Sequence, residues 1–431
     1  METSSTKSSI QSEGSLDSER ASSKASSSSD FEASPPSRVH THWLGFISAL
    51  KKGPVSRLQT FQPTLSIPRF PRRKSKSVGD NVISAIDPVL DSDFYCIRSS
   101  WWNFSLAQIM DATDNFNHCN LIGQGGYSEV YKGLLPDGQI VAIKRLTRGS
   151  PEEMTADFLS ELGIIAHVNH PNVSKIIGYG VDGGMHLVLP LSPNGSLASV
   201  LSGSKEKLSW DIRYRIALGT AKGLAYLHEG CQRRIIHKDI KAANILLSED
   251  FEPLISDFGL AKWLPENCTH HTVTKFEGTF GYLPPEFFLH GMVDEKTDVY
   301  AYGVLLLELI TGRLALDSSK QSLVIWAKPL LTKENIGQLV DPSLGDAYDS
   351  EEMDRMVLTA SWCIHHSSAQ RPQMSQVVKL LCGDQECIEL ANQCQSQRPT
   401  LQRVYSEEIS DEKDYNSTKC FKDHNQRLQI A

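Results

Sequence analysis

The segment IIHKDIKAANILLS (235–248) holds three polar side chains of the kinds that phosphoryl transfer requires. Asp239 can orient a substrate hydroxyl and accept its proton. Lys241 can neutralise charge on a transferring phosphoryl group, and Asn244 offers an oxygen ligand to Mg²⁺. Further along, SDFGLAK supplies Asp257, a second hard oxygen ligand for the same cation. This spacing predicts the catalytic loop and metal site of an enzyme that transfers phosphate.

Upstream of this loop, a glycine-rich segment and a lysine predict a site for the phosphates of ATP. In LIGQGGYSEVYKG, Gly123, Gly125 and Gly126 allow backbone N–H groups to approach phosphate oxygens. Such loops are common, so this one alone is weak support. In IVAIKRL, Lys144 stands in an apolar strand, where an ammonium needs an anion, and the α- and β-phosphates would supply it. Glu161, in FLSELGIIAHV, is expected to pair with Lys144, although a surface carboxylate is its alternative interpretation.

Composition divides the 431 residues into four segments that differ in how they must fold. The first is rich in serine and poor in periodic apolar residues, so it cannot bury enough surface to fold alone. In the second, Ser105 and Gln108 have the spacing of a capping box. The segments are a disordered Ser-rich and basic region (1–100), a short capped helix (101–116), a folded domain (117–382) and a polar, mostly disordered tail (383–431).

The overall totals exclude several classes of protein. The net charge of −8 offers no electrostatic footprint for nucleic acid. The nine cysteines show no C-x-x-C spacing, which argues against a disulfide framework or a zinc site. The most apolar stretch, VYAYGVLLLELI, has 12 residues and contains Glu308, so it predicts a buried core helix and no transmembrane segment. A cytoplasmic protein with reduced thiols is expected.

One part of the N-terminal region has a charge pattern of its own. Residues 38–79 carry nine Lys or Arg side chains and no acidic one. A solvated basic linker is the plainer interpretation, and a contact with anionic lipid or an acidic protein partner is the sharper one. RRKSKS (72–77) also has the composition of a nuclear address, so peripheral plasma-membrane and nuclear pools remain alternatives.

In their order and spacing, these motifs resemble those of the eukaryotic protein kinases across 117–382. The resemblance implies an α+β, two-lobed fold, with a small β-rich lobe over a larger helical one, flanked by disordered tails. It implies transfer of the γ-phosphate of ATP, with Mg²⁺ or Mn²⁺, to protein substrates and to the chain itself. Lys241 together with Thr279, in GTFGYLPPE, is similar to the pattern of serine/threonine kinases.

The resemblance also assigns residues that the motifs alone do not. It implies that Glu286 and Arg371 form a buried ion pair that anchors the activation segment, and that Asp298 braces the catalytic loop. It places the remaining residues around adenine: Ile122, Val130, Ala142 and Leu246 above and below the ring, Leu189 at its back, and the Pro190 carbonyl and Ser192 N–H at its edge.

Lys238 stands where most kinases of this type carry an arginine directly before the catalytic aspartate. That arginine pairs with a phosphate on the activation segment; lysine keeps the charge but loses the bidentate fork. We therefore expect catalysis to survive and regulation to be looser. Thr274 is the preferred phosphate acceptor for a pair with Lys238, and Thr272 is the weaker candidate. Both are otherwise ordinary polar loop residues.

The sequence before the glycine loop, NFSLAQIMDATDNF, and the segment LSPNGSL are similar to plant receptor-like kinases. Because the sequence predicts neither an ectodomain nor a membrane span, we expect the cytosolic type. The HKD loop, WWNFS and LQRVYSEE resemble the subgroup that binds Rho-of-plants (ROP) GTPases in their GTP-bound form. An inactive kinase-fold scaffold is the main alternative, and an adaptor that works through its tails is a weaker one. A scaffold would be expected to lack at least one of four residues, all of which are present: Lys144, Asp239, Asn244 and Asp257.

Overall fold

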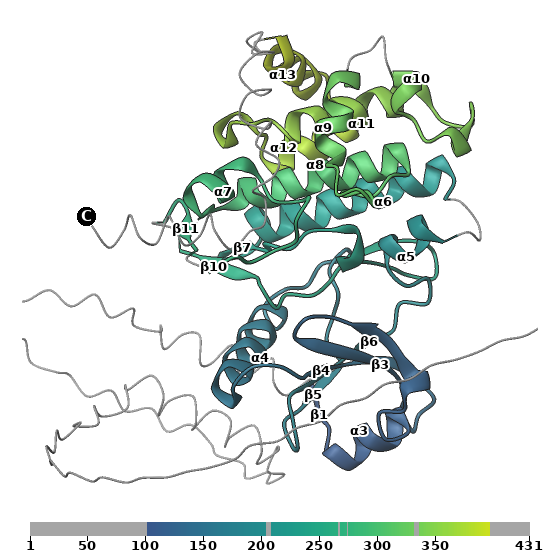
Figure 1. Ribbon diagram of the computed structural model, residues 1–431, viewed down its shortest axis with the longest axis vertical. Coiled ribbons are helices and arrows are strands. Elements are labelled where there is room, and N and C mark those ends of the chain that lie inside the picture. The colour runs from purple at the N-terminus through teal and green to yellow at the C-terminus, as the bar shows by residue number, and fades with distance from the viewer. Residues whose placement is uncertain (1–100, 204–207, 266–267, 274, 332–335, 397–431) are drawn as a thin grey trace, which may run out of the picture. The chain divides into compact units, whose positions relative to one another are not determined.

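A computed structural model gives the structure of the chain (Figure 1). The predictions for 1–100, including the basic segment 38–79, and for LQRVYSEE lie outside the residues that it describes. The described residues are 101–203, 208–265, 268–273, 275–331 and 336–396.

The small lobe is built on a six-stranded sheet with the order β1-β5-β6-β4-β3-β2. Its strand pairs are antiparallel except that β1 runs parallel to β5. The inner strand β4 is buried from Val141 to Lys144, as its apolar sequence IVAIKRL predicts. The strands are β1 (Trp102–Asn103), β2 (Leu121–Gln124), β3 (Ser128–Leu134), β4 (Ile140–Leu146), β5 (Gly178–Gly180) and β6 (His186–Pro190).

Two helices, each started by a capping box, accompany this sheet (Figure 1). In α3 (Leu106–Thr113), the Ser105 hydroxyl accepts from the Gln108 N–H and the Gln108 side chain accepts from the Ser105 N–H, as the sequence predicts. In α4 (Pro151–Ile165), Ser150 and Glu153 do the same, and proline occupies the first turn, where no N–H is needed. The second helix carries Glu161 to the sheet.

The large lobe is helical and packs around α8 (Glu295–Thr311), which is buried along nearly its whole length. This confirms the core helix predicted for VYAYGVLLLELI. Within the ranges that the structure describes, no helix combines the length and apolar character that crossing a bilayer needs. The other helices are α5 (Leu197–Ser202), α6 (Trp210–Ala225), α7 (Pro285–His290), α9 (Leu323–Ala327), α10 (Ile336–Leu339), α11 (Ser350–Cys363), α12 (Met374–Leu381) and α13 (Gln385–Ser396).

Three two-stranded antiparallel ribbons hold the loops that carry the polar motifs. The first two flank 237–244 and 256–261, so they fix the loops that contain Asp239 and Asp257. The third ties the activation segment to the residues before α8. The pairs are β7 (Arg234–Ile236) with β10 (Lys262–Leu264), β8 (Ile245–Leu247) with β9 (Pro253–Ile255), and β11 (His271–Thr272) with β12 (Met292–Val293).

Part of the polar tail that was expected from residue 383 is a helix, α13, over Gln385–Ser396, which the sequence did not predict. Cys387 and Ala391, one helical turn apart, bury a narrow apolar stripe of α13 against Trp362 and Leu380. Two short side chains in a polar segment make too weak a pattern to predict a helix. The two-lobed α+β fold is confirmed.

Candidate active site

Lys144 joins three elements that lie far apart in the sequence. Its Nζ, on β4, donates to both carboxylate oxygens of Glu161 on α4, at 2.7 and 2.8 Å, and to Asp257 Oδ1 at 2.6 Å. The lysine and Glu161 side chains are buried, while Asp257 is 44% exposed. The three donors of the ammonium are therefore all used, and the two lobes are connected through one side chain.

Lys144 and Asp257 stabilise each other's charged forms, whereas burial raises the pKa of Glu161 in spite of the adjacent ammonium. Burial alone would lower the pKa of Lys144, but the carboxylates of Glu161 and Asp257 outweigh it and raise that pKa. Burial would likewise raise the pKa of Asp257, yet the adjacent ammonium lowers it to about 2. Asp257 is therefore ionised at neutral pH, as a cation ligand must be.

Asp239 is held by donors from two different loops. Its Oδ2 accepts from Lys241 Nζ at 2.6 Å and from Asn244 Nδ2 at 3.1 Å, and its Oδ1 accepts from Thr279 Oγ1 at 2.6 Å. Lys241 Nζ also donates to Thr279 Oγ1 at 2.8 Å. The structure thus brings the predicted catalytic pair together with Asn244 and with the threonine of the activation segment. A carboxylate fixed in this way is oriented before a substrate arrives.

A buried aspartate of α8 supports the catalytic loop from below. Asp298, 1% exposed, accepts from the backbone N–H groups of His237 and Lys238 at 2.7 and 2.8 Å. His237 is fully buried, packs edge-on against Phe258 and contacts the Ser256 carbonyl through Nε2 at 3.0 Å. The structure therefore gives Asp298 the bracing position that the resemblance implies and His237 a packing role.

Asn244 and Asp257 offer the two oxygen ligands that a divalent cation would use. The Asn244 side-chain nitrogen is engaged with Asp239, which leaves the amide oxygen for a cation. The Asn244 carbonyl accepts from Ser256 N and Oγ, both at 2.9 Å, so the two ligand-bearing loops are directly connected. Two protein oxygens suit Mg²⁺, which commonly takes its other ligands from phosphates and water. The residues present fit that cation.

Gly259 lies close to the carboxylates of this cluster. A Cβ there would lie 3.3 Å from Asp257 Oδ1 and 3.6 Å from Glu161 Oε2. The first distance is tight and the second is an ordinary contact, so a side chain at this position would press on the Asp257 carboxylate that binds Lys144.

The face of the sheet that carries Lys144 also carries most residues assigned to adenine. Val130 and Lys144 are direct partners between β3 and β4, and Ala142 and Leu189 are partners between β4 and β6. Paired residues and residues two positions apart point to one face of a sheet, so these four form one surface. Ile122, in contrast, is 51% exposed on β2.

The remaining adenine positions lie where the chain passes between the lobes. Pro190 ends β6, and the Ser192 carbonyl accepts from Gly195 N at 3.0 Å in a turn. Leu246 lies on β8, in the large lobe, and its backbone forms a β-bridge with Ser196. This bridge joins β8 to the segment that connects the two lobes.

Side chains could be added at the three glycines of the glycine loop without a clash, so packing alone does not explain these glycines. A Cβ on Gly126 would meet no atom within 4 Å, and one on Gly125 would make only ordinary contact with Ser128. Gly123 is likewise in ordinary contact with Val130. Since packing does not demand glycine at these positions, their absent side chains fit the approach of phosphate oxygens to the loop.

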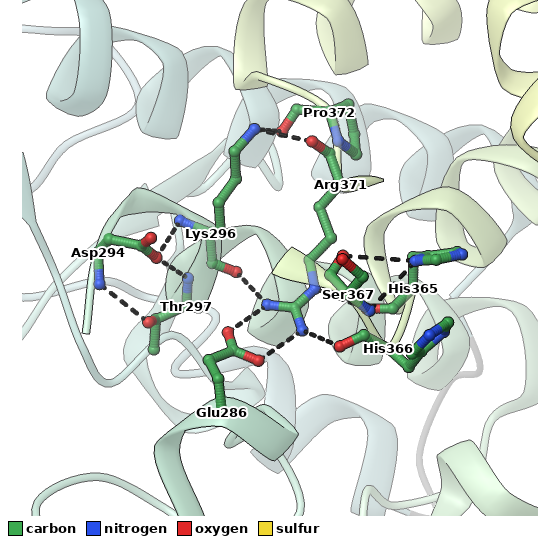
Figure 2. A network of polar contacts seen from close by, with 9 residues as sticks. All are labelled: Glu286, Asp294, Lys296, Thr297, His365, His366, Ser367, Arg371 and Pro372. Atoms are coloured by element: carbon green, nitrogen blue, oxygen red, sulfur yellow. Dashed lines mark hydrogen bonds and ion pairs between the residues drawn. The ribbon is translucent and has the colours of Figure 1, made fainter. Parts of the chain in front are cut away.

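The activation segment is anchored at its end by the predicted Glu286–Arg371 pair (Figure 2). Arg371 Nη1 and Nη2 donate to the two oxygens of Glu286 at 2.5 and 2.8 Å, and the arginine side chain is fully buried. Its remaining donors bind the carbonyls of His365, His366 and Lys296, as Figure 2 shows. Every guanidinium donor direction is thereby used, which is what a buried arginine requires.

A second anchor, which the sequence did not predict, joins Tyr282 to α8. The Tyr282 hydroxyl donates to Glu308 Oε2 at 2.6 Å and accepts from the Ala242 N–H at 3.3 Å. Glu308 Oε1 accepts from the Ala315 N–H at 3.0 Å. Burial raises the pKa of Glu308 to about 7, although the hydrogen bonds from Tyr282 and Ala315 oppose the change.

This carboxyl should make stability depend on pH. Because its folded-state pKa exceeds its ordinary value, its contribution is complete below about pH 4.5 and is lost as pH rises through about 7, roughly 3 kcal/mol in all. We expect Glu308→Gln to flatten the unfolding free energy over this range, measured by urea denaturation at several pH values. The exposed Glu152→Gln serves as the control and should keep the natural slope. Identical slopes in natural chain and Glu308→Gln would contradict the assignment.

The lysine of the predicted phosphate switch, Lys238, has a carboxylate partner in the structure, and the switch itself stays a prediction. The buried Lys238 Nζ pairs with Glu277 of the activation segment, whereas Thr272 is exposed on β11 and paired through its backbone with Met292. Thr274 lies outside the described residues. A pair that spans 39 positions leaves no local pattern, so the sequence offered no signal for Glu277.

Comparison with known proteins identifies the family to which this site belongs. A family model described as the protein kinase domain matches residues 116–408. The chain belongs to the protein kinase family. This kinase is 55% identical over 395 residues to the receptor-like cytosolic serine/threonine-protein kinase RBK2 of Arabidopsis thaliana, covering 91% of this chain and 85% of that protein. It is 48% identical over 391 residues to RBK1 of the same plant, with 90% and 82% covered.

These relatives place the kinase with the receptor-like cytosolic serine/threonine kinases. Its reaction is therefore ATP-dependent phosphorylation of protein serine and threonine hydroxyls, with a divalent cation. The predicted family, fold class and enzyme class are confirmed.

Proposed function

We propose that Asp239 is the catalytic residue that receives the substrate hydroxyl proton and that Lys241 stabilises the transferring phosphoryl group. The observation that carries this assignment is the set of donors on Asp239, which come from Lys241, Asn244 and Thr279. They orient one carboxylate toward the place where the activation segment meets the catalytic loop. Thr279 shares its hydroxyl between Asp239 and Lys241 and so fixes the distance between the two.

Mg²⁺ is the cation that we assign to Asn244 and Asp257, with Mn²⁺ as the alternative. When bound, it would neutralise charge on the phosphates. Lys144, aimed by Glu161, would hold the α- and β-phosphates, and the glycine loop would cover them with backbone N–H groups. Adenine would lie against the surface of Val130, Ala142 and Leu189, with the other assigned contacts from Ile122, Leu246, the Pro190 carbonyl and the Ser192 N–H.

Transfer of the γ-phosphate tests these roles and the proposed autophosphorylation. The purified chain would be supplied with ATP and either Mg²⁺ or Mn²⁺, with itself and a generic basic protein as acceptors. Phosphorylated sites would be mapped by mass spectrometry, and Asp239→Asn would be the control. Phosphate on serine or threonine that disappears in the control supports the assignment; ATP binding without any transfer would instead favour the scaffold.

We further propose that a GTP-bound Rho-of-plants GTPase is a partner of this kinase. The support is the resemblance of WWNFS, the HKD loop and LQRVYSEE to the subgroup that binds these GTPases. We expect the GTP-loaded protein to raise the turnover of the kinase above the rates measured without GTPase and with the GDP-loaded protein. Turnover would be compared with GTP-loaded, GDP-loaded and no GTPase. An equal rate in all three would contradict the proposal.

A cytoplasmic kinase with a fraction at the plasma membrane is the location that we propose. The basic segment 38–79 would supply the attraction to anionic lipid. Sedimentation with phosphatidylserine vesicles, compared with neutral phosphatidylcholine vesicles, would test it. Equal binding to both kinds of vesicle, or binding that does not weaken with salt, would mean that 38–79 is only a solvated linker. A nuclear fraction of the kinase that disappears when RRKSKS is changed would favour the nuclear address.

A further inference from the structure

The catalytic loop and the activation segment are joined by two neighbouring contacts. Asp239 binds Thr279, and one residue earlier in the catalytic loop Lys238 binds Glu277. Gly278 lies between Glu277 and Thr279 with φ +114°, and a Cβ there would lie 3.2 Å from the Lys238 carbonyl oxygen. The two segments therefore run so close that neither contact can shift without moving the other.

The backbone conformation of Lys238 is unusual and is fixed by a buried hydrogen bond. Its φ of +70° is in the left-handed region, which is unfavourable for a residue with a long side chain. The conformation is held by the bond from its N–H to Asp298. The side chain is only 3% exposed, so its ammonium needs an anionic partner, and Glu277, 33% exposed, is the one present.

The contact belongs to the assembled state of the site. In the same structure Lys144 is paired with Glu161, and Asp239 has its donors in place. Glu277 therefore does not hold the activation segment away from the reacting groups. Its carboxylate lies beside the Lys238 ammonium, where a phosphorylated side chain would otherwise bind. The chain carries this carboxylate without any modification. A single carboxylate can be paired by the single ammonium of Lys238. A phosphate would favour the bidentate guanidinium of an arginine.

We propose that Glu277 is a positioning residue that docks the activation segment on Lys238, so that this kinase transfers phosphate before its own activation segment is phosphorylated. The inference rests on the proposed role of Asp239, which Glu277 serves through Thr279. It replaces the pair between Lys238 and phospho-Thr274 that the sequence suggested. Phosphorylation of Thr272 or Thr274 then has no large part left to play in ordering the loop.

The test uses the full chain after phosphatase treatment and removal of the phosphatase. The dephosphorylated natural chain and the Thr272→Ala/Thr274→Ala variant should both keep kcat within about twofold of the phosphorylated chain, a change too small for a lost charged contact. Glu277→Ala leaves a buried ammonium unpaired and should lower kcat roughly ten- to a hundredfold. Its KM for ATP should stay unchanged, because Glu277 touches no residue assigned to the nucleotide. A general loss of structure would not produce that split.

Exchanging the two charges provides the rescue. Lys238→Glu alone should be as slow as Glu277→Ala, and Lys238→Glu with Glu277→Lys should recover a substantial part of kcat because the pair is restored. If Glu277→Ala does not fold, the threonine variant still decides the question, because it leaves Glu277 in place.

Three results would overturn the proposal, and they have different meanings. A natural chain that is active only when phosphorylated, or a Glu277→Ala variant with natural kcat, would remove the docking role and leave the catalytic assignment intact. A natural chain inactive in both phosphorylation states, with ATP still bound, would remove the catalytic assignment and the docking role together.

Discussion

An Asp239→Asn variant will transfer phosphate about 10²- to 10⁴-fold more slowly than the natural chain, which is the usual worth of a positioned general base. The amide is nearly the same size as the carboxylate and can still accept one of the hydrogen bonds that Lys241 and Thr279 now make. It cannot take a proton from a substrate hydroxyl. ATP affinity and the free energy of unfolding should therefore change little, and the loss should lie in kcat.

Single-turnover phosphorylation of a basic protein, together with equilibrium binding of ATP, measures the two quantities separately. Asp182→Asn is a suitable control, because it makes the same chemical change on an exposed turn between β5 and β6. If Asp239→Asn retained more than about a tenth of the natural rate, the loss would fall below the range expected for a base and the assignment would fail.

The largest effect on stability is expected at Arg371. Arg371→Ala leaves Glu286 without its partner and deprives three backbone carbonyls of a donor, as Figure 2 makes clear. Breaking a buried pair from one side costs about 3–5 kcal/mol, a large fraction of the stability of an ordinary domain. Activity should fall as well, since Glu286 lies in the first turn of α7, directly after the activation segment.

Urea denaturation of Arg371→Ala and of Arg215→Ala would separate burial from charge. Arg215 is 47% exposed and faces Glu252 at 3.9 Å, so its loss should cost 0–1 kcal/mol. Similar losses in the two variants would mean that the Glu286–Arg371 pair does not anchor the segment.

Much of the site was predictable because its residues have strong local contexts. Lys144 in an apolar strand demands a counter-charge, and Glu161 on the next helix can reach it. Asp239, Lys241 and Asn244 lie on one short loop, so their spacing nearly determines their contacts. These contacts leave traces in the sequence because the chemistry requires both a residue type and a fixed separation.

What could not be predicted depends on contacts between distant segments. Glu277 and Glu308 are ordinary glutamates in sequence, and only the folded chain brings them to Lys238 and Tyr282. Helix α13 was missed because its buried stripe consists of two small side chains, Cys387 and Ala391, whose partners lie on other helices. Glu277 also carries no hydroxyl, so a search of the activation segment for residues that accept phosphate does not find it.

The edge strand β1 determines where a folding fragment of this kinase can begin. Phe104 and Ile109, 6% and 0% exposed, belong to the core of the small lobe, although they precede the glycine loop. Gly178 and Gly180 on β5 make room for them, because a Cβ at Gly178 would lie 2.7 Å from Phe104 Cε2 and one at Gly180 would lie 2.4 Å from Ile109 Cδ1. A fragment cut at residue 117 by a protease would therefore open this core and lose its outermost strand. Limited proteolysis should therefore leave a resistant fragment that keeps residues 101–116.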